Sequence, residues 1–243
     1  MAINEILIDT SVAAAGGDSD PNILLDLNAS DVDSYDGDGD VWYDIHDFEY
    51  KPTTNVAQNF NTVLYTGNGN TSNPQTNIGF SPDLVWIADR DAGNYNPIQD
   101  SVRGVNSVLV TALDSAEQPS SWRNSYGQIT SFDLDGFNVS DGSGNTNSNF
   151  NQSGRDYVAW CFKAGGASVT NTNGDLQSQV SANNDLGFSI VSYTGNNSFG
   201  QTVGHGLDVQ PQMVIYKNLS NARNWRTYVE AIGATKYLNL DDK

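Results

Sequence analysis

The densest group of potential metal ligands lies in an acidic stretch near the start of the chain. Carboxylates recur there at closely spaced positions through a glycine-containing turn, at Asp31, Asp33, Asp36, Asp38 and Asp40. Ca²⁺, the one cofactor this sequence suggests, takes roughly six to eight oxygen ligands in a flexible geometry. The helical calcium-loop pattern is not met, because the twelfth position counted from Ser34 is Ile45 rather than glutamate. A calcium site and a solvated hairpin tip are both compatible with this turn.

Two further carboxylates are the candidates for acid–base catalysis. Cleavage of a polysaccharide needs one carboxyl group held protonated and one held ionised across a cleft. Asp133 and Asp135 alternate with large apolar residues and would share one face of a strand, but a glycine turn follows them. We interpret them as a solvated strand edge. His46 and His205 lie in separate segments with no serine or cysteine signature beside them, so we expect no catalytic residues and no enzymatic activity.

Aromatic side chains are the remaining resource for binding, because their flat apolar faces can stack on a sugar ring. Trp122 and Arg123 lie among polar residues, and Trp225 has a similar setting near the end of the sequence. We take these three as candidate ligand-binding residues. The alternative roles are a cap on the end of a sandwich and burial between subunits. Trp86 and Trp160 lie in apolar runs and are expected in the core.

The charge of the chain limits the class of partner. There are 29 acidic and 11 basic residues, which give a formal net charge of −18 at pH 7. Such a field repels nucleic-acid phosphates and anionic lipids, so we expect neither nucleic-acid binding nor membrane insertion. The first residues lack the basic, then apolar, then small-residue order of a secretory signal, which predicts synthesis in a cytoplasm. The single cysteine, Cys161, lies in an apolar run and is expected to be buried and inert.

The elements that would position these residues are short β-strands. Runs of β-branched, aromatic or aliphatic residues are bounded by Gly, Asn or Pro, with no convincing helical periodicity between them. Clear examples are Ser107–Thr111, Gln128–Phe132, Gly136–Val139 and Tyr157–Phe162. This spacing predicts an all-β protein made of antiparallel β-sandwich or jelly-roll-like modules in tandem.

Two sequence blocks recur in the same order, which indicates a duplicated module. Phe60–Asn68 parallels Phe188–Asn196 at a spacing of 128 positions, and Phe80–Ile87 parallels Val209–Tyr216 at a spacing of 129. A counterpart of the strand Tyr157–Phe162 is missing from the second copy. Either this copy is degenerate or the native chain continues beyond Lys243, and we expect the longer chain. The predicted organisation is an acidic N-terminal attachment segment at 1–57, a first module at 58–164, a linker at 165–184 and an incomplete second copy at 185–243.

Several of these segments resemble a repeated module of tail-fibre-like and other virion proteins of bacteriophages, marine phages especially. The resemblance is carried by Tyr65–Asn68, Gly79–Ile87, Asp100–Gly104 and the closing strand Asp156–Phe162. In addition, the segment Leu25–Ile45 is similar to the opening of concanavalin-like laminin-G sandwiches.

The resemblance implies a structural protein of the virion with a lectin-like β-sandwich. It would be a homotrimeric tail fibre, attached to the particle by its N-terminal region and in contact with other virion proteins. Adsorption to the host would involve a surface glycan. A capsid decoration protein or head fibre is the alternative within viruses, and a free carbohydrate-binding module is the alternative outside them. A glycan-cleaving enzyme comes last.

Overall fold

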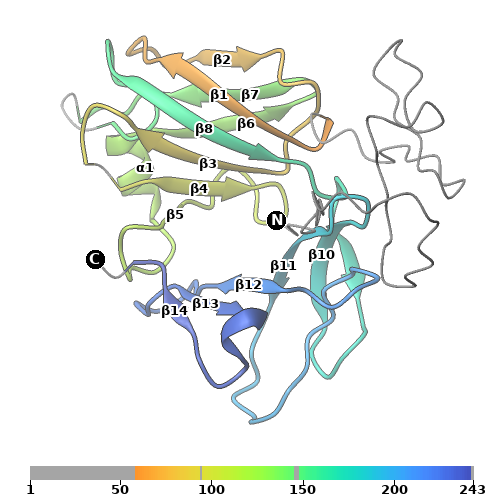
Figure 1. Cartoon of the computed structure of the whole chain (residues 1–243). Coiled ribbons are helices and arrows are strands. Elements are labelled where there is room, and N and C mark those ends of the chain that lie inside the picture. Colours follow the sequence, from red (N-terminus) through yellow and green to blue (C-terminus); the bar gives the residue numbers. More distant parts are fainter. Residues whose placement is uncertain (1–57, 94, 145–147, 242–243) are drawn as a thin grey trace, which may run out of the picture. The chain divides into compact units, whose positions relative to one another are not determined.

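The computed structural model describes residues 58–93, 95–144 and 148–241 (Figure 1). Nearly all regular structure in this part of the chain is β-strand. The predicted attachment segment at 1–57, with the candidate calcium ligands Asp31, Asp33, Asp36, Asp38 and Asp40, lies outside the described residues. In the described part, no helix is long and apolar enough to cross a membrane.

Residues 60–162 form two antiparallel sheets packed face to face, which confirms the predicted all-β sandwich (Figure 1). The larger sheet has the order β1 (Phe60–Thr66), β8 (Asp156–Phe162), β3 (Leu84–Asp89), β4 (Pro97–Asp100), β5 (Leu109–Val110). The smaller sheet has the order β2 (Asn73–Thr76), β7 (Gly136–Ser140), β6 (Gln128–Asp133). A short helix, α1 (Ser120–Tyr126), connects β5 to β6. The last strand of this module, β8, lies inside the larger sheet, because it pairs with β1 on one edge and with β3 on the other.

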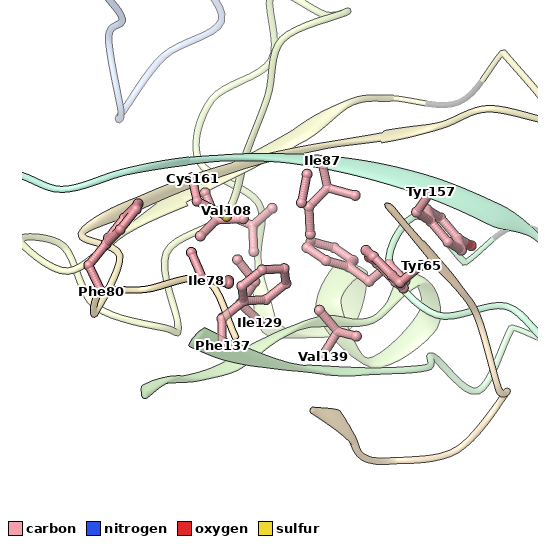
Figure 2. Packing of buried hydrophobic residues seen from close by; sticks show 13 residues of the cluster. Tyr65, Ile78, Phe80, Ile87, Val108, Ile129, Phe137, Val139, Tyr157 and Cys161 are labelled. Carbon is pink, nitrogen blue, oxygen red and sulfur yellow. The ribbon is translucent and has the colours of Figure 1, made fainter. Parts of the chain in front are cut away.

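The core lies between the two sheets and follows from the alternation of side chains along each strand. Tyr157, Ala159 and Cys161 of β8 are fully buried, whereas the residues between them are half-buried on the opposite face. They share one cluster with buried residues of β3, β6 and β7, which are Val85, Ile87, Ile129, Phe137 and Val139 (Figure 2). Burial raises the pKa of the Cys161 thiol to about 12. Each large apolar side chain buried here stabilises the fold by about 1.5–3 kcal/mol.

Trp86 and Trp160 do not belong to this core, contrary to the sequence interpretation. They are direct cross-strand partners on the outer face of the larger sheet, with ring centroids 5.8 Å apart in an edge-to-face arrangement. The reason is the two-residue period of a strand. Val85 and Ile87 face the smaller sheet, so Trp86 between them must face outward. The outer face of the larger sheet is therefore lined by half-buried indole rings.

The Tyr-Thr-Gly-Asn turn after β1 is held by the loop that precedes β8. The ring of Tyr65 stacks on Tyr157 with centroids 5.1 Å apart, and its hydroxyl donates a hydrogen bond to the Phe150 carbonyl oxygen at 2.7 Å. Gly67 approaches the same loop so closely that a Cβ atom there would lie 2.1 Å from the Gln152 carbonyl oxygen. The turn is thus fixed by tertiary packing in addition to its own backbone preferences.

The remaining described strands form two three-stranded antiparallel sheets. One has the order β11 (Phe188–Tyr193), β10 (Ser178–Asn183), β9 (Val169–Asn171), and the other the order β12 (Met213–Tyr216), β13 (Arg226–Val229), β14 (Leu238–Asn239). A 3-10 turn, η2 (Glu230–Ile232), follows β13. The segment 165–184, predicted as a linker, therefore contains two strands. The sequence indicates one possible strand there, at Leu176–Val180, which overlaps β10, whereas the polar run of β9 gives no such signal.

The sheet of β12, β13 and β14 repeats the register of β3, β4 and β5 at a spacing of 129 residues. Each residue pair of the first set has its counterpart paired in the second, as in Leu84–Asp100 with Met213–Val229 and Ile98–Leu109 with Thr227–Leu238. Turn hydrogen bonds recur at the same spacing. The side chains of Asp89 and Asn218 each accept bonds from the backbone N–H groups two and three residues ahead, at 2.8–3.0 Å. The two segments thus share their pairing as well as their sequence pattern.

Candidate functional site

Three aromatic rings gather around the helix α1, and we call them the ring cluster. Trp122 and Tyr126 lie one helical turn apart, with ring centroids 4.8 Å apart. Tyr95, which precedes β4, lies 6.4 Å from the first ring and 6.0 Å from the second. All three side chains are half-buried, and Trp122 also packs against the core of the sandwich. Part of each ring therefore anchors the helix while the rest stays open to solvent.

The local sequence and a neighbouring loop together fix the helix that carries Trp122 and Tyr126. The helix begins after Pro119 and ends at Gly127, whose φ of 84° suits glycine and whose N–H donates a hydrogen bond to the Arg123 carbonyl oxygen at 2.8 Å. A Cβ atom at Gly127 would lie 2.3 Å from the Ser140 carbonyl oxygen. The N–H of Asn149 donates to the carbonyl oxygen at the end of the helix, at 2.9 Å. The rings are thus mounted on a backbone that is held from both sides.

Arg123, the second predicted binding residue, follows Trp122 in sequence, and its side chain is half-buried. Its Nη1 donates a hydrogen bond to the Gln118 carbonyl oxygen at 3.1 Å. A guanidinium group carries five N–H donors in a planar fork. This bond therefore orients the side chain and leaves further donors of the same group for a polar ligand beside the rings.

Trp225, the third predicted binding residue, lies in a different setting. It is 4% exposed, and its Nε1 donates a hydrogen bond to the Val110 carbonyl oxygen of β5 at 2.9 Å. The Lys217 ammonium group lies 5.9 Å from the centroid of its ring, and burial lowers the pKa of that lysine. Protein atoms thus occupy the surroundings of this indole, which anchors its segment on β5.

Asp133 and Asp135 are exposed at the turn between β6 and β7, where the sequence placed a solvated edge. The Asp135 carboxylate accepts hydrogen bonds from the N–H groups of Gly79 at 2.6 Å and Asn77 at 3.2 Å. Both of its oxygens are therefore engaged in holding the loop between β2 and β3. This arrangement gives Asp135 a structural role.

An open hollow of about 450 Å³ is lined by Asn173, Gly174 and residues 202–208. His205 lies in its wall, and its Nδ1 accepts a hydrogen bond from the Leu207 N–H at 3.1 Å. Near the rim, hydrogen bonds from Thr202 lower the pKa of Asp175. Across the described residues, no group of three or more His, Cys, Asp or Glu side chains is placed to hold a metal ion. The ring cluster is thus the best-defined candidate surface for a ligand.

Two members of the ring cluster were not anticipated from the sequence. Tyr126 follows Trp122 by four positions, which places both on one face of a helix, and Pro119 and Gly127 bracket that helix. The spacing and the two bracketing residues are visible in the sequence, but they cover a helix of only seven residues. Tyr95 is tied to the helix through Asn149, whose Oδ1 accepts a hydrogen bond from the Tyr95 N–H at 3.3 Å and whose N–H donates to the Tyr126 carbonyl oxygen at 2.9 Å. The sequence neighbours of Tyr95 give no indication of that contact.

A comparison with known protein families gives a match over most of the chain. Residues 55–243 match the model of a family described as a domain of unknown function, DUF7483. No curated protein and no solved structure matches the chain.

Proposed function

We propose that this chain, which belongs to the DUF7483 family of domains of unknown function, is a structural protein of a bacteriophage virion. In this proposal it is a homotrimeric tail fibre, attached to the particle by its N-terminal region. Its β-sandwich modules contact the host surface during adsorption, and they carry out no catalysis. Its partners are other virion proteins and a glycan on the host.

The observation that carries this proposal is the recurrence of one β-sheet register along the chain at a spacing of 129 residues. Repetition of a structural unit extends a protein in one direction, because each unit contacts its neighbours and adds length. Such extension suits a fibre, whereas an enzyme with one active site has no need of it.

The segments that resemble phage proteins are also those that hold the first module together. Tyr65–Asn68 is the turn locked by the loop before β8. Asp100–Gly104 contains a buried ion pair between Asp100 and Arg103. The residues that carry the resemblance are therefore ones that stabilise the first sandwich. This supports the proposal that the sandwich is of the type found in the phage proteins.

Within this proposal, the ring cluster is the contact for a glycan. Aromatic faces present apolar area to the C–H groups of a sugar, and the Arg123 guanidinium beside them supplies donors for hydroxyl oxygens. Because Trp122 and Tyr126 are held on a fixed helix, less conformational entropy is lost when a ligand binds. Ligand selectivity would follow from the tilt of the rings, since Trp122 and Tyr126 meet at an interplanar angle of 36°.

Substitution of Trp122 tests this contact. We expect Trp122→Ala to weaken binding of surface polysaccharide by at least about tenfold, because buried aromatic anchors contribute on the order of 2 kcal/mol or more to an interface. Binding is measured by glycan microarray and titration calorimetry. Leu134→Ala, at a side chain that is 90% exposed on the β6–β7 turn, is the control and should bind as the parent does. Trp122→Leu keeps bulk against the core, so equal binding by this variant and the parent would contradict the assignment.

The ring cluster also suits a second candidate, a free carbohydrate-binding module, because glycan contact does not require a particle. The two candidates differ in where the protein is found after lysis of infected cells. Immunogold labelling of purified particles separates them, and it also separates a tail fibre from a capsid decoration protein or head fibre.

A further inference from the structure

The strand β12 has an open edge. In the order β12, β13, β14 it is the outermost strand, and within the described residues it pairs with β13 alone. Its four residues, Met213, Val214, Ile215 and Tyr216, are apolar or aromatic and between 39% and 50% exposed. An uncovered apolar strand edge is a template for another strand, and such edges are usually protected by charge, proline or a bulge. The residues 213–216 contain no charged residue and no proline.

The repeated register identifies what covers this edge in the first copy. There β3 pairs with β4 on one side and with β8 on the other. In the second copy, β13 takes the place of β4 and pairs with β12 in the register in which β4 pairs with β3. The open edge of β12 therefore corresponds to the edge of β3 that β8 covers. A backbone hydrogen bond just before β12 supports this correspondence. The Glu230 N–H donates to the Gln212 carbonyl oxygen at 2.8 Å, and at the equivalent positions before β3 the Ser101 N–H donates to the Asp83 carbonyl oxygen at 2.7 Å.

We propose that the open edge of β12 accepts an antiparallel strand from a partner polypeptide, with the residue pattern of β8. The pairing of β3 with β8 gives the chemistry of this strand position by position. Small residues, Ala159 and Cys161, lie opposite Ile87 and Val85, and the aromatic Trp160 lies opposite Trp86. The partner strand accordingly presents a small residue opposite Tyr216, an aromatic one opposite Ile215 and a small one opposite Val214.

The charges beside this edge indicate which residue can precede the added strand. In the first copy, the Asp89 carboxylate accepts a hydrogen bond from Arg155, the residue before β8, at 2.7 Å. Its counterpart in the second copy is the neutral Asn218, which keeps the turn hydrogen bonds of Asp89. A strand that joins β12 therefore needs no arginine before it. Backbone pairing supplies affinity and the alternating side chains supply selectivity, as in other cases of strand addition.

The test uses the full chain and a synthetic peptide with the sequence of residues 155–163, in which Cys161 is replaced by alanine. We expect the peptide to slow amide hydrogen exchange at residues 213–216 by at least tenfold while leaving β3 unchanged. The same peptide with proline at the position of Ala159 cannot complete the ladder and should have no effect. Val214→Lys places a charge on the receiving edge and should abolish the protection, whereas Leu134→Lys, an exposed apolar-to-lysine change on the β6–β7 turn, should retain it.

A second arrangement guards against poor peptide solubility. The peptide sequence is fused behind Lys243 through a flexible glycine–serine linker, and exchange is compared with a fusion that carries the proline. Slower exchange at residues 213–216 in the first fusion alone supports the proposal. Equal exchange in the two fusions, or protection that persists in Val214→Lys, would overturn it. This outcome is independent of the virion role, because a strand can be accepted by a protein that never joins a particle.

Discussion

Replacement of Arg103 by alanine is expected to destabilise the protein by about 3–5 kcal/mol, the usual cost of removing one partner from a buried ion pair. The Nε and Nη2 atoms of Arg103 each lie 2.6 Å from one carboxylate oxygen of Asp100, and Nη1 lies 3.1 Å from Glu117. The side chains of Arg103 and Asp100 are 11% and 5% exposed. The variant would leave a buried carboxylate without its cation. The shift is measured by urea unfolding followed by tryptophan fluorescence.

The second copy of the module shows how both partners of this ion pair can be replaced together. Asp100 and Arg103 correspond at the spacing of 129 to Val229 and Ile232, so the chain itself replaces the ion pair by two apolar residues. The double variant Asp100→Val with Arg103→Ile should therefore recover most of the stability that Arg103→Ala loses, because neither charge is then buried alone. Arg90→Ala, at an exposed arginine, is the control for loss of a positive charge. A double variant as unstable as Arg103→Ala would contradict this explanation.

Gly67→Ala is expected to lower the free energy of unfolding by about 2–3 kcal/mol, toward the upper end of the cost of overpacking. The added Cβ would lie 2.1 Å from the Gln152 carbonyl oxygen, and that obstacle is backbone, which cannot rotate away as a side chain could. The loop before β8 would have to move, and with it the carbonyl of Phe150 that receives the Tyr65 hydroxyl. Chemical denaturation measures the total loss, and hydrogen exchange locates it in β1 and β8.

The matched control is Gly195→Ala, at the corresponding position of the second Tyr-Thr-Gly-Asn turn. A Cβ atom there meets nothing within 4 Å. The substitution should therefore change stability by no more than about 0.5 kcal/mol, as is usual for surface sites. Equal losses in the two variants would mean that the glycines serve the turn itself rather than the packing of Gly67.

The strands of the first module were accessible to sequence reasoning because their apolar runs are short and bounded by turn residues. Gln128–Phe132 and Tyr157–Phe162 were each expected as strands and occur as β6 and β8. The duplication was visible for a related reason, since turns such as Tyr193–Asn196 keep their sequence even where their packing differs. Periodicity and turn chemistry are local, and local patterns survive in the sequence.

The sequence predicts the strands better than it predicts which side chains of a strand face the core. Trp86 lies in an apolar run, yet the two-residue period turns it away from the core, and apolar residues on both sides of the strand concealed this. Trp225 sits among polar neighbours, but a partner 115 residues away in sequence, the Val110 carbonyl, buries it. Tyr95 is held beside Tyr126 by hydrogen bonds to Asn149, which lies 54 residues from Tyr95 in sequence. Such contacts depend on tertiary structure, which a single sequence does not display.

The most direct test of the proposed role is quantitative mass spectrometry of purified virus particles from cells that produce this chain. If the chain is a tail fibre, peptides from residues 58–241 should occur in a fixed ratio to the other virion proteins. They should be retained through density-gradient purification and enriched in an isolated tail fraction. Detection of the chain in the free lysate alone, with none on the particles, would contradict it.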